Sequence, residues 1–263
     1  MNNFQIIVPT LNSFGVLNKL IESLQIQTWR FWRVIFVDGE SNFEHVSWLK
    51  YQCLNDKRFS YIKQRKENIG IFGAMNQGLE IADQKNWILF WGSDDWVFDT
   101  NTLELLNKKI IRSTFSKADI IVCKGKYFSL EQRILTRNAQ FKKFEGDTII
   151  NQRKYKNLIF KGLTPPHQTT LMNPKLFIDR KPYDDKLGIA ADLDFFCRLA
   201  NNKNILVGIV NLNLVIISSG GVSAKNHLKR LKEVLISYKG LFKRFYLIPF
   251  ILRYFYRILQ NIL

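Results

Sequence analysis

The sequence predicts an α/β protein with a mostly parallel central sheet and helices on both faces. Short apolar runs at 4–8, 34–37 and 87–91 have the length and composition of buried strands. Apolar residues recur at helical spacing between these runs, over 17–24 and 71–82. Strands that alternate with helices form parallel sheets, because each helix returns the chain to the same edge of the sheet.

The rest of the chain continues this alternation less regularly. We expect a further strand at 59–63, another at 168–172, and a helix at 191–200 whose apolar face includes Leu193 and Phe196. The basic region 124–161 has little periodicity, and the sequence assigns it no role.

The length of 263 residues suits one large domain and leaves little room for a second. We expect an α/β domain over 1–223 and a basic, amphipathic, helical tail over 224–263. The formal net charge of +17 favours a polyanionic partner: nucleic acid, an anionic lipid surface or a phosphate-bearing substrate. The tail contributes much of this charge, with nine Lys and Arg residues against a single acid, Glu233.

The tail combines this charge with aromatic and aliphatic runs at 245–252 and 254–259. Pro249 and Arg253 interrupt these runs, so neither provides the ~20 apolar residues of a membrane-spanning helix. The pattern is typical of an amphipathic helix that lies on an anionic membrane. The alternative is a helix docked on the domain with its basic side in solvent.

The cysteines and the N-terminus favour the cytoplasm. Cys53, Cys123 and Cys197 are odd in number and widely spaced, which argues against a disulfide framework and a structural zinc site. Residues 1–11 lack the charged region and long apolar core of a secretory signal. Together with the tail, these features predict a cytoplasmic protein held peripherally on the inner face of the cell membrane.

The strongest local signal is the acidic turn Ser93-Asp94-Asp95, which follows Gly92 after an apolar strand. Adjacent carboxylates repel each other and are costly to bury, so a site that holds them usually also holds a cation. Mg²⁺ or Mn²⁺ would suit these oxygen ligands and would take its remaining ligands from water and substrate phosphate. The alternative is an Asp-rich turn that caps the helix beginning near Asp99.

Polar residues also follow two other predicted strands, Thr10 to Asn12 after the first and Asp38 to Ser41 after the second. Because ligands bind beyond the carboxyl ends of parallel strands, we expect these clusters and the acidic turn to converge. Taken alone, a tight turn, or a helix cap formed by Asn12 or Ser13, explains these clusters equally well.

Seven motifs occur along the chain in order: VPTLN (8–12), VDGES (37–41), ENIGIFGAMNQGLEIA (67–82), WGSDDW (91–96), PHQTTLMNPKLF (166–177), IAADLDFFCRL (189–199) and SSGGVS (218–223). One such motif carries little weight, but their order and spacing together are specific. The sequence resembles glycosyltransferase family 2, especially bacterial enzymes of surface-polysaccharide synthesis such as those for colanic acid and O-antigen.

The resemblance implies the GT-A fold and transfer of a sugar from a nucleotide-diphosphate donor, most simply a UDP-sugar, with inversion at the anomeric carbon. The residues that it assigns to the donor are Pro9, Thr10, Asn12, Asp38, Gly70, Asn76, Ser93 and Asp94. Asp38 would accept a hydrogen bond from the base, Asp94 would approach the ribose, and Asp95 would bind the metal ion beneath the diphosphate. A packing role suits Asn76 equally well.

Asp192 matches the catalytic base of the family. Inversion needs a carboxylate to take the proton of the acceptor hydroxyl while that hydroxyl attacks opposite the leaving phosphate. Asp194 would point to a different face of the same helix. The alternative for Asp192 is a carboxylate that satisfies free amides at a helix N-terminus. His167 and Gln168 match a motif near the acceptor, although a lone histidine is often structural.

The partners expected from these arguments are a nucleotide-sugar donor, a lipid-linked saccharide acceptor and an anionic membrane surface reached by the tail, with no nucleic acid; the sequence leaves a homodimer open. Two other functions compete. A basic nucleic-acid-binding protein would explain the charge, but no module of that kind is recognisable. A sugar-phosphate nucleotidyltransferase would share the sheet and the metal site, but it needs a glycine-rich, basic N-terminal phosphate loop that the sequence lacks.

Overall fold

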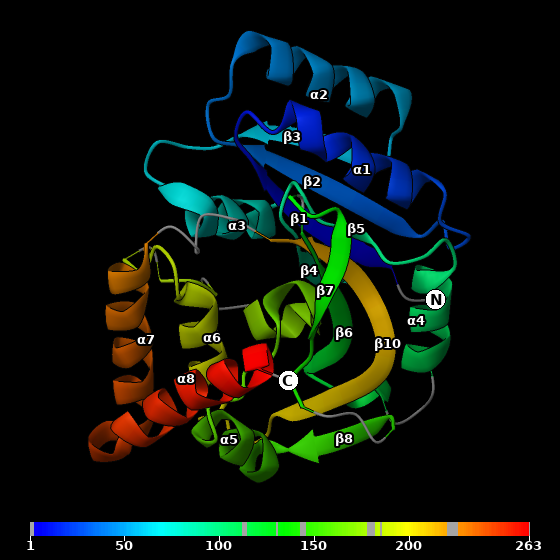
Figure 1. The fold of residues 1–263 in the computed structure, drawn as a ribbon. Helices are drawn as coiled ribbons and strands as arrows, with labels where there is room; N and C mark the ends of the chain where they lie inside the picture. Colours follow the sequence, from blue (N-terminus) through cyan, green and yellow to red (C-terminus); the bar gives the residue numbers. More distant parts are fainter. Residues whose placement is uncertain are drawn as a thin grey trace.

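The computed structural model describes residues 3–111, 115–129, 131–142, 146–177, 182–184, 186–219 and 226–262 (Figure 1). Its strands are β1 (Phe4–Thr10), β2 (Trp32–Asp38), β3 (Phe59–Lys63), β4 (Trp87–Phe90), β5 (Trp96–Val97), β6 (Ile120–Ser129), β7 (Ile134–Ala139), β8 (Thr148–Asn151), β9 (Thr170–Met172) and β10 (Leu206–Ser218). Its α-helices are α1 (Phe14–Gln25), α2 (Phe43–Asn55), α3 (Gly70–Glu80), α4 (Thr102–Ile111), α5 (Gln152–Phe160), α6 (Ala191–Leu199), α7 (His227–Phe242) and α8 (Leu247–Ile262).

All ten strands belong to one sheet, in the order β3-β2-β1-β4-β9-β6-β10-β5, with β7 beside β6 and β8 beside β10. The first four strands are parallel, as the sequence predicted. The other half is mixed, because β9 runs antiparallel to both of its neighbours, β4 and β6. The parallel half is therefore the part of the sheet that places several strand ends at one edge.

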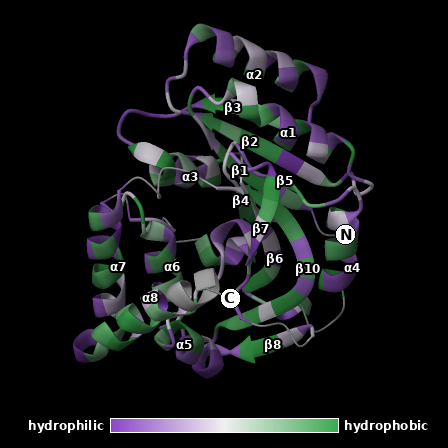
Figure 2. Ribbon diagram, in the orientation of Figure 1, coloured by the Kyte–Doolittle hydropathy of each residue, from purple (hydrophilic) through white to green (hydrophobic). Residues whose placement is uncertain are grey.

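Helices cover both faces of the sheet, as expected, and each face has its own apolar core. Successive residues of β1 point to opposite faces. Ile6 packs in the core that includes Leu17 of α1 and Leu103 of α4, and Ile7 packs in the core that includes Phe72 of α3 and Phe196 of α6. Figure 2 shows that β1, β2 and β10 are mostly hydrophobic along their length. The predicted α/β class is confirmed.

Several elements differ from the prediction, and three of them show why. α2 lies where no element was expected, and only His45 and Leu49 are buried among its residues, so its apolar periodicity is weak. β10 was also missed, although it has thirteen residues, because Asn211 and Asn213 interrupt its apolar run. The strand expected at 168–172 is shortened to β9, since a 3₁₀ turn occupies His167–Thr169.

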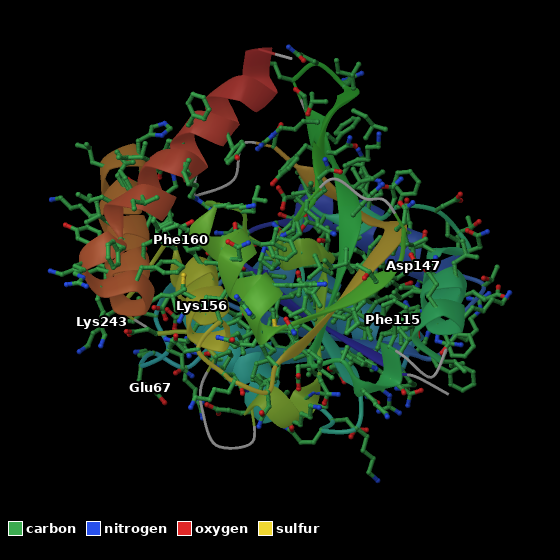
Figure 3. All side chains as sticks on the ribbon, turned by 90° about the horizontal axis from the view of Figure 1, so that it is seen from below. Glu67, Phe115, Asp147, Lys156, Phe160 and Lys243 are labelled. Carbon is green, nitrogen blue, oxygen red and sulfur yellow. The ribbon has the colours of Figure 1, made fainter. Side chains whose placement is uncertain are left out.

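The tail forms two helices, with a 3₁₀ turn at Lys243–Phe245 between them. α7 packs on α6, and its Tyr238 belongs to the same core as that helix. α8 continues across α5 (Figures 1 and 3). Phe160 of α5 also packs on Phe242 at the end of α7, with 5.1 Å between the ring centroids. No helix in the described part of the chain is long and apolar enough to cross a membrane. The domain boundary expected at Ser223 lies outside the described residues, so that division stays a prediction.

Candidate active site

The carboxyl ends of three adjacent parallel strands bring the polar clusters to one edge of the sheet. β1 lies between β2 and β4, and Thr10 and Asp38 are directly opposite each other in the register. β4 ends at Phe90, which is opposite Ile7, so the acidic turn follows it beside the end of β1. Neighbouring strands are about 4.8 Å apart, so the three clusters span only about 10 Å. The expected convergence of these strand ends is present.

Asp38 is the centre of a buried hydrogen-bond cluster. Its side chain is only 1% exposed. Thr10 Oγ1 and Ser41 Oγ donate to Asp38 Oδ1 at 3.1 and 2.5 Å, and the Ser41 backbone N–H donates to Oδ2 at 2.9 Å. His45 Nε2 lies 3.4 Å from Oδ1. The Asp38 carboxylate thus orders the turn after β2. Its predicted hydrogen bond with the nucleobase of the donor stays a prediction.

Asn12 connects the turns that follow β1 and β2. Its backbone is left-handed, with φ 48°, a conformation that asparagine tolerates better than most residues. Its N–H donates to Ser41 Oγ at 2.7 Å, and its Oδ1 accepts from the Asn42 N–H at 2.9 Å. Ser13 occupies the N-cap position of α1, as one alternative from the sequence had it, but its side chain makes no capping hydrogen bond. Pro9, half-buried in β1, lies opposite Val37.

α3 carries two more of the predicted donor residues. Gly70 starts the helix with φ +70°, and its carbonyl accepts from Gln64 Nε2 at 2.9 Å. Asn76 is buried in the middle of the helix. Its Nδ2 donates to the Tyr183 carbonyl at 3.0 Å, and its Oδ1 accepts from the Tyr183 N–H at 3.2 Å. Asn76 therefore ties α3 to the segment ahead of α6, the packing role that the sequence left open.

The acidic turn has one fully buried carboxylate and one that is partly exposed. Asp95 is 2% exposed, and it accepts from the backbone N–H groups of Gly92 at 2.7 Å and Ser218 at 3.3 Å. Burial, and then the charge of Asp94, raise the pKa of Asp95 to about 8. Burial also raises the pKa of Asp94. Ser93, half-buried, begins the turn.

Both carboxylates of this turn face the same point. A Cβ added to Gly92 would lie 2.7 Å from Asp94 Oδ1 and 3.1 Å from Asp95 Oδ2, so glycine keeps this space open. A divalent cation held by the two carboxylates would offset the burial that raises both pKa values and the charge of Asp94 that further raises the pKa of Asp95. Among the described residues, no group of three His, Cys, Asp or Glu side chains could hold a metal ion. Two carboxylate side chains are the kind of donor that a hard divalent ion takes when substrate and water supply its other ligands.

His167 and Gln168 lie next to β4 in the 3₁₀ turn. The His167 ring stacks on Phe90, with 5.5 Å between centroids, and its Nε2 shares a 2.5 Å hydrogen bond with the Tyr183 hydroxyl. Burial lowers the pKa of His167, and the charge of Asp192 opposes this shift. The Gln168 carbonyl accepts from Trp91 Nε1 at 2.9 Å. These contacts join the acceptor-side motif to the end of β4.

Asp192 lies in the first turn of α6 and lines a cavity of about 280 Å³ together with His167 and Gln168. Its Oδ1 accepts from the Leu193 N–H at 2.7 Å, which fixes the orientation of the carboxylate. Asp194 does not line this cavity and pairs instead with Arg198, with 2.7 Å between Oδ2 and Nε. The two carboxylates of α6 therefore face different surroundings, as helical spacing predicted.

Sequence reasoning missed two residues that hold the site together. Glu233 of α7 is buried and accepts from the backbone N–H groups of Gly188, Ile189 and Ala190 at 3.1, 2.8 and 2.8 Å, just ahead of α6. The signal that could have identified Glu233 is its position as the single acid in the basic tail. Ser218, at the end of β10, donates its hydroxyl to the Asp94 carbonyl at 2.9 Å, and its motif was noted without a role.

Comparison with protein families gives a match that covers about two thirds of the chain. The model described as glycosyl transferase family 2 matches residues 5–177. A PGL/p-HBAD biosynthesis glycosyltransferase of Mycobacterium bovis (strain BCG / Pasteur 1173P2) is 27% identical over 237 residues, which cover 87% of this chain and 83% of that relative.

Solved structures share the fold at low sequence identity. S. aureus TarS 1-349 in complex with UDP-GlcNAc has a TM-score of 0.69 at 20% identity, over 97% of this chain and 73% of that one. In a longer TarS crystal structure, this chain spans 43% of the solved chain. The mannosyltransferase PcManGT from Pyrobaculum calidifontis, in complex with GDP-Man and Mn²⁺, has a TM-score of 0.63 at 13% identity, over 96% and 69% of the two chains.

Proposed function

The chain belongs to glycosyl transferase family 2 and has the GT-A fold, and we therefore propose that it transfers a sugar from a nucleoside-diphosphate sugar to an acceptor hydroxyl with inversion. The observation that carries this proposal is the meeting of three strand ends, with Thr10, Asp38 and Asp95, at one sheet edge. The complexes of TarS with UDP-GlcNAc and of PcManGT with GDP-Man support a donor of this class, and we favour a UDP-sugar.

Asp192 is the proposed catalytic base. Its carboxylate takes the proton of the acceptor hydroxyl, whose oxygen attacks the anomeric carbon of the donor sugar. The bond from that carbon to the diphosphate oxygen breaks on the opposite face, so the configuration inverts and a nucleoside diphosphate leaves. The Leu193 N–H holds one carboxylate oxygen, and the side chain lines the open cavity that an acceptor needs.

Asp95 is the residue proposed to hold Mg²⁺ or Mn²⁺, with the carboxylate of Asp94, which is assigned to the ribose side of the donor, beside it. When bound, the ion supplies positive charge against the negative charge that grows on the leaving diphosphate. The Mn²⁺ in the PcManGT complex supports a divalent ion. The backbone N–H groups of Gly92 and Ser218 keep Asp95 oriented, and Gly92 leaves space in front of both carboxylates.

We further propose a lipid-linked saccharide as the acceptor, on the cytoplasmic face of the membrane, in surface-polysaccharide synthesis. The support is α8, whose exposed residues Leu247, Ile248, Ile251 and Phe255 fall on one side of the helix. Lys243 and Arg244 are exposed at its start. An apolar stripe with adjoining basic residues is the pattern of a helix that lies in an anionic membrane interface.

The test is donor turnover by the full chain. Incubation with a panel of UDP- and GDP-sugars and MgCl₂ or MnCl₂ should release nucleoside diphosphate from at least one donor, and EDTA should stop the release. Asp192→Asn should lower kcat by a factor of roughly 10² or more, because general-base catalysis contributes about that much. The same variant should still be stabilised against heat by the donor.

Asp194→Asn is the matched control, since it removes a carboxylate from the same helix outside the cavity; it should keep activity within a few-fold. Equal losses in the two variants would remove Asp192 from the role of base. Absence of nucleoside diphosphate release from every donor, with both metal ions present, would contradict the proposed function.

A further inference from the structure

The cavity beside Asp192 has a strongly cationic wall. It lies between the start of α6, β7, the segment 162–168 and the two tail helices. Three arginines line it, Arg137 from β7, Arg230 from α7 and Arg253 from α8, whereas Asp192 is the single carboxylate among its described lining residues. The wall thus has two positive charges in excess. Positive charges in a concave, partly buried site attract anions more strongly than the same charges on an open surface.

Two of these arginines have neutral partners. Arg253 Nη1 donates to Thr164 Oγ1 at 2.7 Å, and its buried Nε has no hydrogen-bond partner. The guanidinium of Arg137 lies over the Tyr127 ring, 4.1 Å from the centroid. Within the described part of the chain, neither residue forms an ion pair with a carboxylate. Their charges and several of their N–H donors are therefore left for a ligand.

The backbone places Arg253 at the cavity rather than in solvent. Gly162 has φ +80°, and any Cβ there would collide with the backbone of α8 at Arg253, so glycine lets the helix lie directly against this segment. On the other side, Arg230 Nη2 lies 3.2 Å from His227 Nδ1 in the first turn of α7. The arginines thus come from three elements far apart in the sequence and meet at one cavity.

We propose that this cavity binds a phosphate or diphosphate group of the acceptor, with Arg253 and Arg137 as its main ligands. The inference rests on the proposed function, because it assigns Asp192 to the acceptor hydroxyl. Planar guanidinium groups bind phosphate oxygens in pairs, with shorter and stronger hydrogen bonds than neutral donors make. An anion held here would place a hydroxyl of the attached sugar beside the base. The favoured substrate is then a glycosyl phosphate or diphosphate and not a neutral saccharide.

Inorganic pyrophosphate is the first probe, measured by calorimetry with the full chain in EDTA and about 150 mM salt, which suppresses binding to metal and to exposed charges. Arg253→Gln and Arg137→Gln should each weaken binding by roughly tenfold or more. Arg153→Gln, an exposed arginine of α5 outside the cavity, is the matched control and should bind as the wild type does. Because Arg253 also contacts Thr164, Arg137→Gln, on an exposed strand position, provides the same test if Arg253→Gln fails to fold.

Turnover measurements distinguish two possible acceptors that carry such a phosphate group, a soluble glycosyl phosphate and a lipid-linked one. At saturating donor, a glycosyl phosphate in solution and the same head group on a lipid in phosphatidylcholine vesicles are compared with the unphosphorylated glycoside. A lower KM for either phosphorylated acceptor, lost in Arg137→Gln, supports the proposal and identifies the source. Equal pyrophosphate affinity in all four proteins, or no preference for a phosphorylated acceptor, would overturn it. A failure of the proposed function can be told apart from a failure of the anion site. In the former case the wild type and Arg153→Gln would release no nucleoside diphosphate from any donor.

Discussion

At the scale of single residues, burial decides the charge state of the groups around the site. Asp38 is 1% exposed but accepts hydrogen bonds from Thr10 and Ser41. His45 is buried just as deeply and has no hydrogen-bond partner on either ring nitrogen within the described residues. Burial lowers the pKa of His45, although the nearby Asp38 opposes the shift. A deeply buried imidazole of this kind is neutral near pH 7.

This arrangement predicts a pH dependence of folding. An unfolded histidine titrates near pH 6.5, above the lowered pKa of folded His45, so below about pH 6.5 the unfolded state binds the proton first. The contribution of His45 to the free energy of unfolding is therefore present above pH 6.5 and lost as pH falls, by at most ~1.4 kcal/mol per pH unit. His167 contributes with the same sign, because burial lowers its pKa too.

Urea unfolding at pH 7.5 and 5.5 measures this effect. His45→Gln should lose less stability between the two pH values than the wild type, whatever its absolute stability. His227→Gln, at an exposed position in the first turn of α7, should lose as much as the wild type. A pH dependence in His45→Gln as steep as that of the wild type would show that His45 is not held neutral.

Residue types were more predictable from the sequence than residue contacts. Strand ends with Thr10, Asp38 and Asp95 could be predicted because parallel strands end at a common edge. The partners of Asn76 and Asp95 could not, because Tyr183 and Ser218 are more than a hundred residues away in the chain. Sequence pattern reports which side chains face a core, but the choice of distant partner depends on the packed tertiary structure.

At the scale of elements, periodicity predicted those that bury a full face and missed those that do not. α1 buries four apolar residues at helical spacing, whereas α2 buries only His45 and Leu49. β10 has runs of buried residues separated by half-buried and exposed ones, and it includes two asparagines, so no simple alternation appears. α8 differs from both kinds of element, because it is apolar on two sides. Phe250 and Tyr254 pack on the core, and Ile251 faces solvent.

The exposed side of α8 predicts binding to an anionic membrane, and negative charges placed on that side should weaken it. Ile251 and Phe255 are 62% and 55% exposed and lie one helical turn apart. Ile251→Glu combined with Phe255→Glu should leave the core side of the helix intact, while the two carboxylates oppose insertion into an anionic interface. Co-sedimentation with vesicles that contain phosphatidylglycerol should fall at least severalfold. Leu228→Glu, at a 76% exposed position of α7, is the control with the same kind of change and should sediment like the wild type.

At the scale of the whole molecule, the tail and the α/β core share contacts across the candidate site. Glu233 of α7 accepts three backbone N–H bonds from Gly188, Ile189 and Ala190, and Ala190 is the N-cap residue of α6, whose own side chain supplies no cap. Tyr238 packs in the same core as Phe196. A tail that supplies the missing cap to the helix of Asp192 should unfold together with that helix, and not as a separate unit.

Glu233→Gln tests this coupling with probes that are remote from the mutation. All six tryptophans lie between Trp29 and Trp96 in the sequence, outside α6 and the tail, so their fluorescence reports on the sheet and its N-terminal connections and not on the tail itself. Loss of a buried carboxylate that serves three amides should lower the free energy of unfolding by about 1–3 kcal/mol, and the tryptophan transition should shift with it. Glu22→Gln, exposed on α1, should change stability by less than about 0.5 kcal/mol. If the tryptophan transition keeps its wild-type midpoint in Glu233→Gln while helical signal is lost earlier, the tail folds independently and residues 224–263 form a unit of their own.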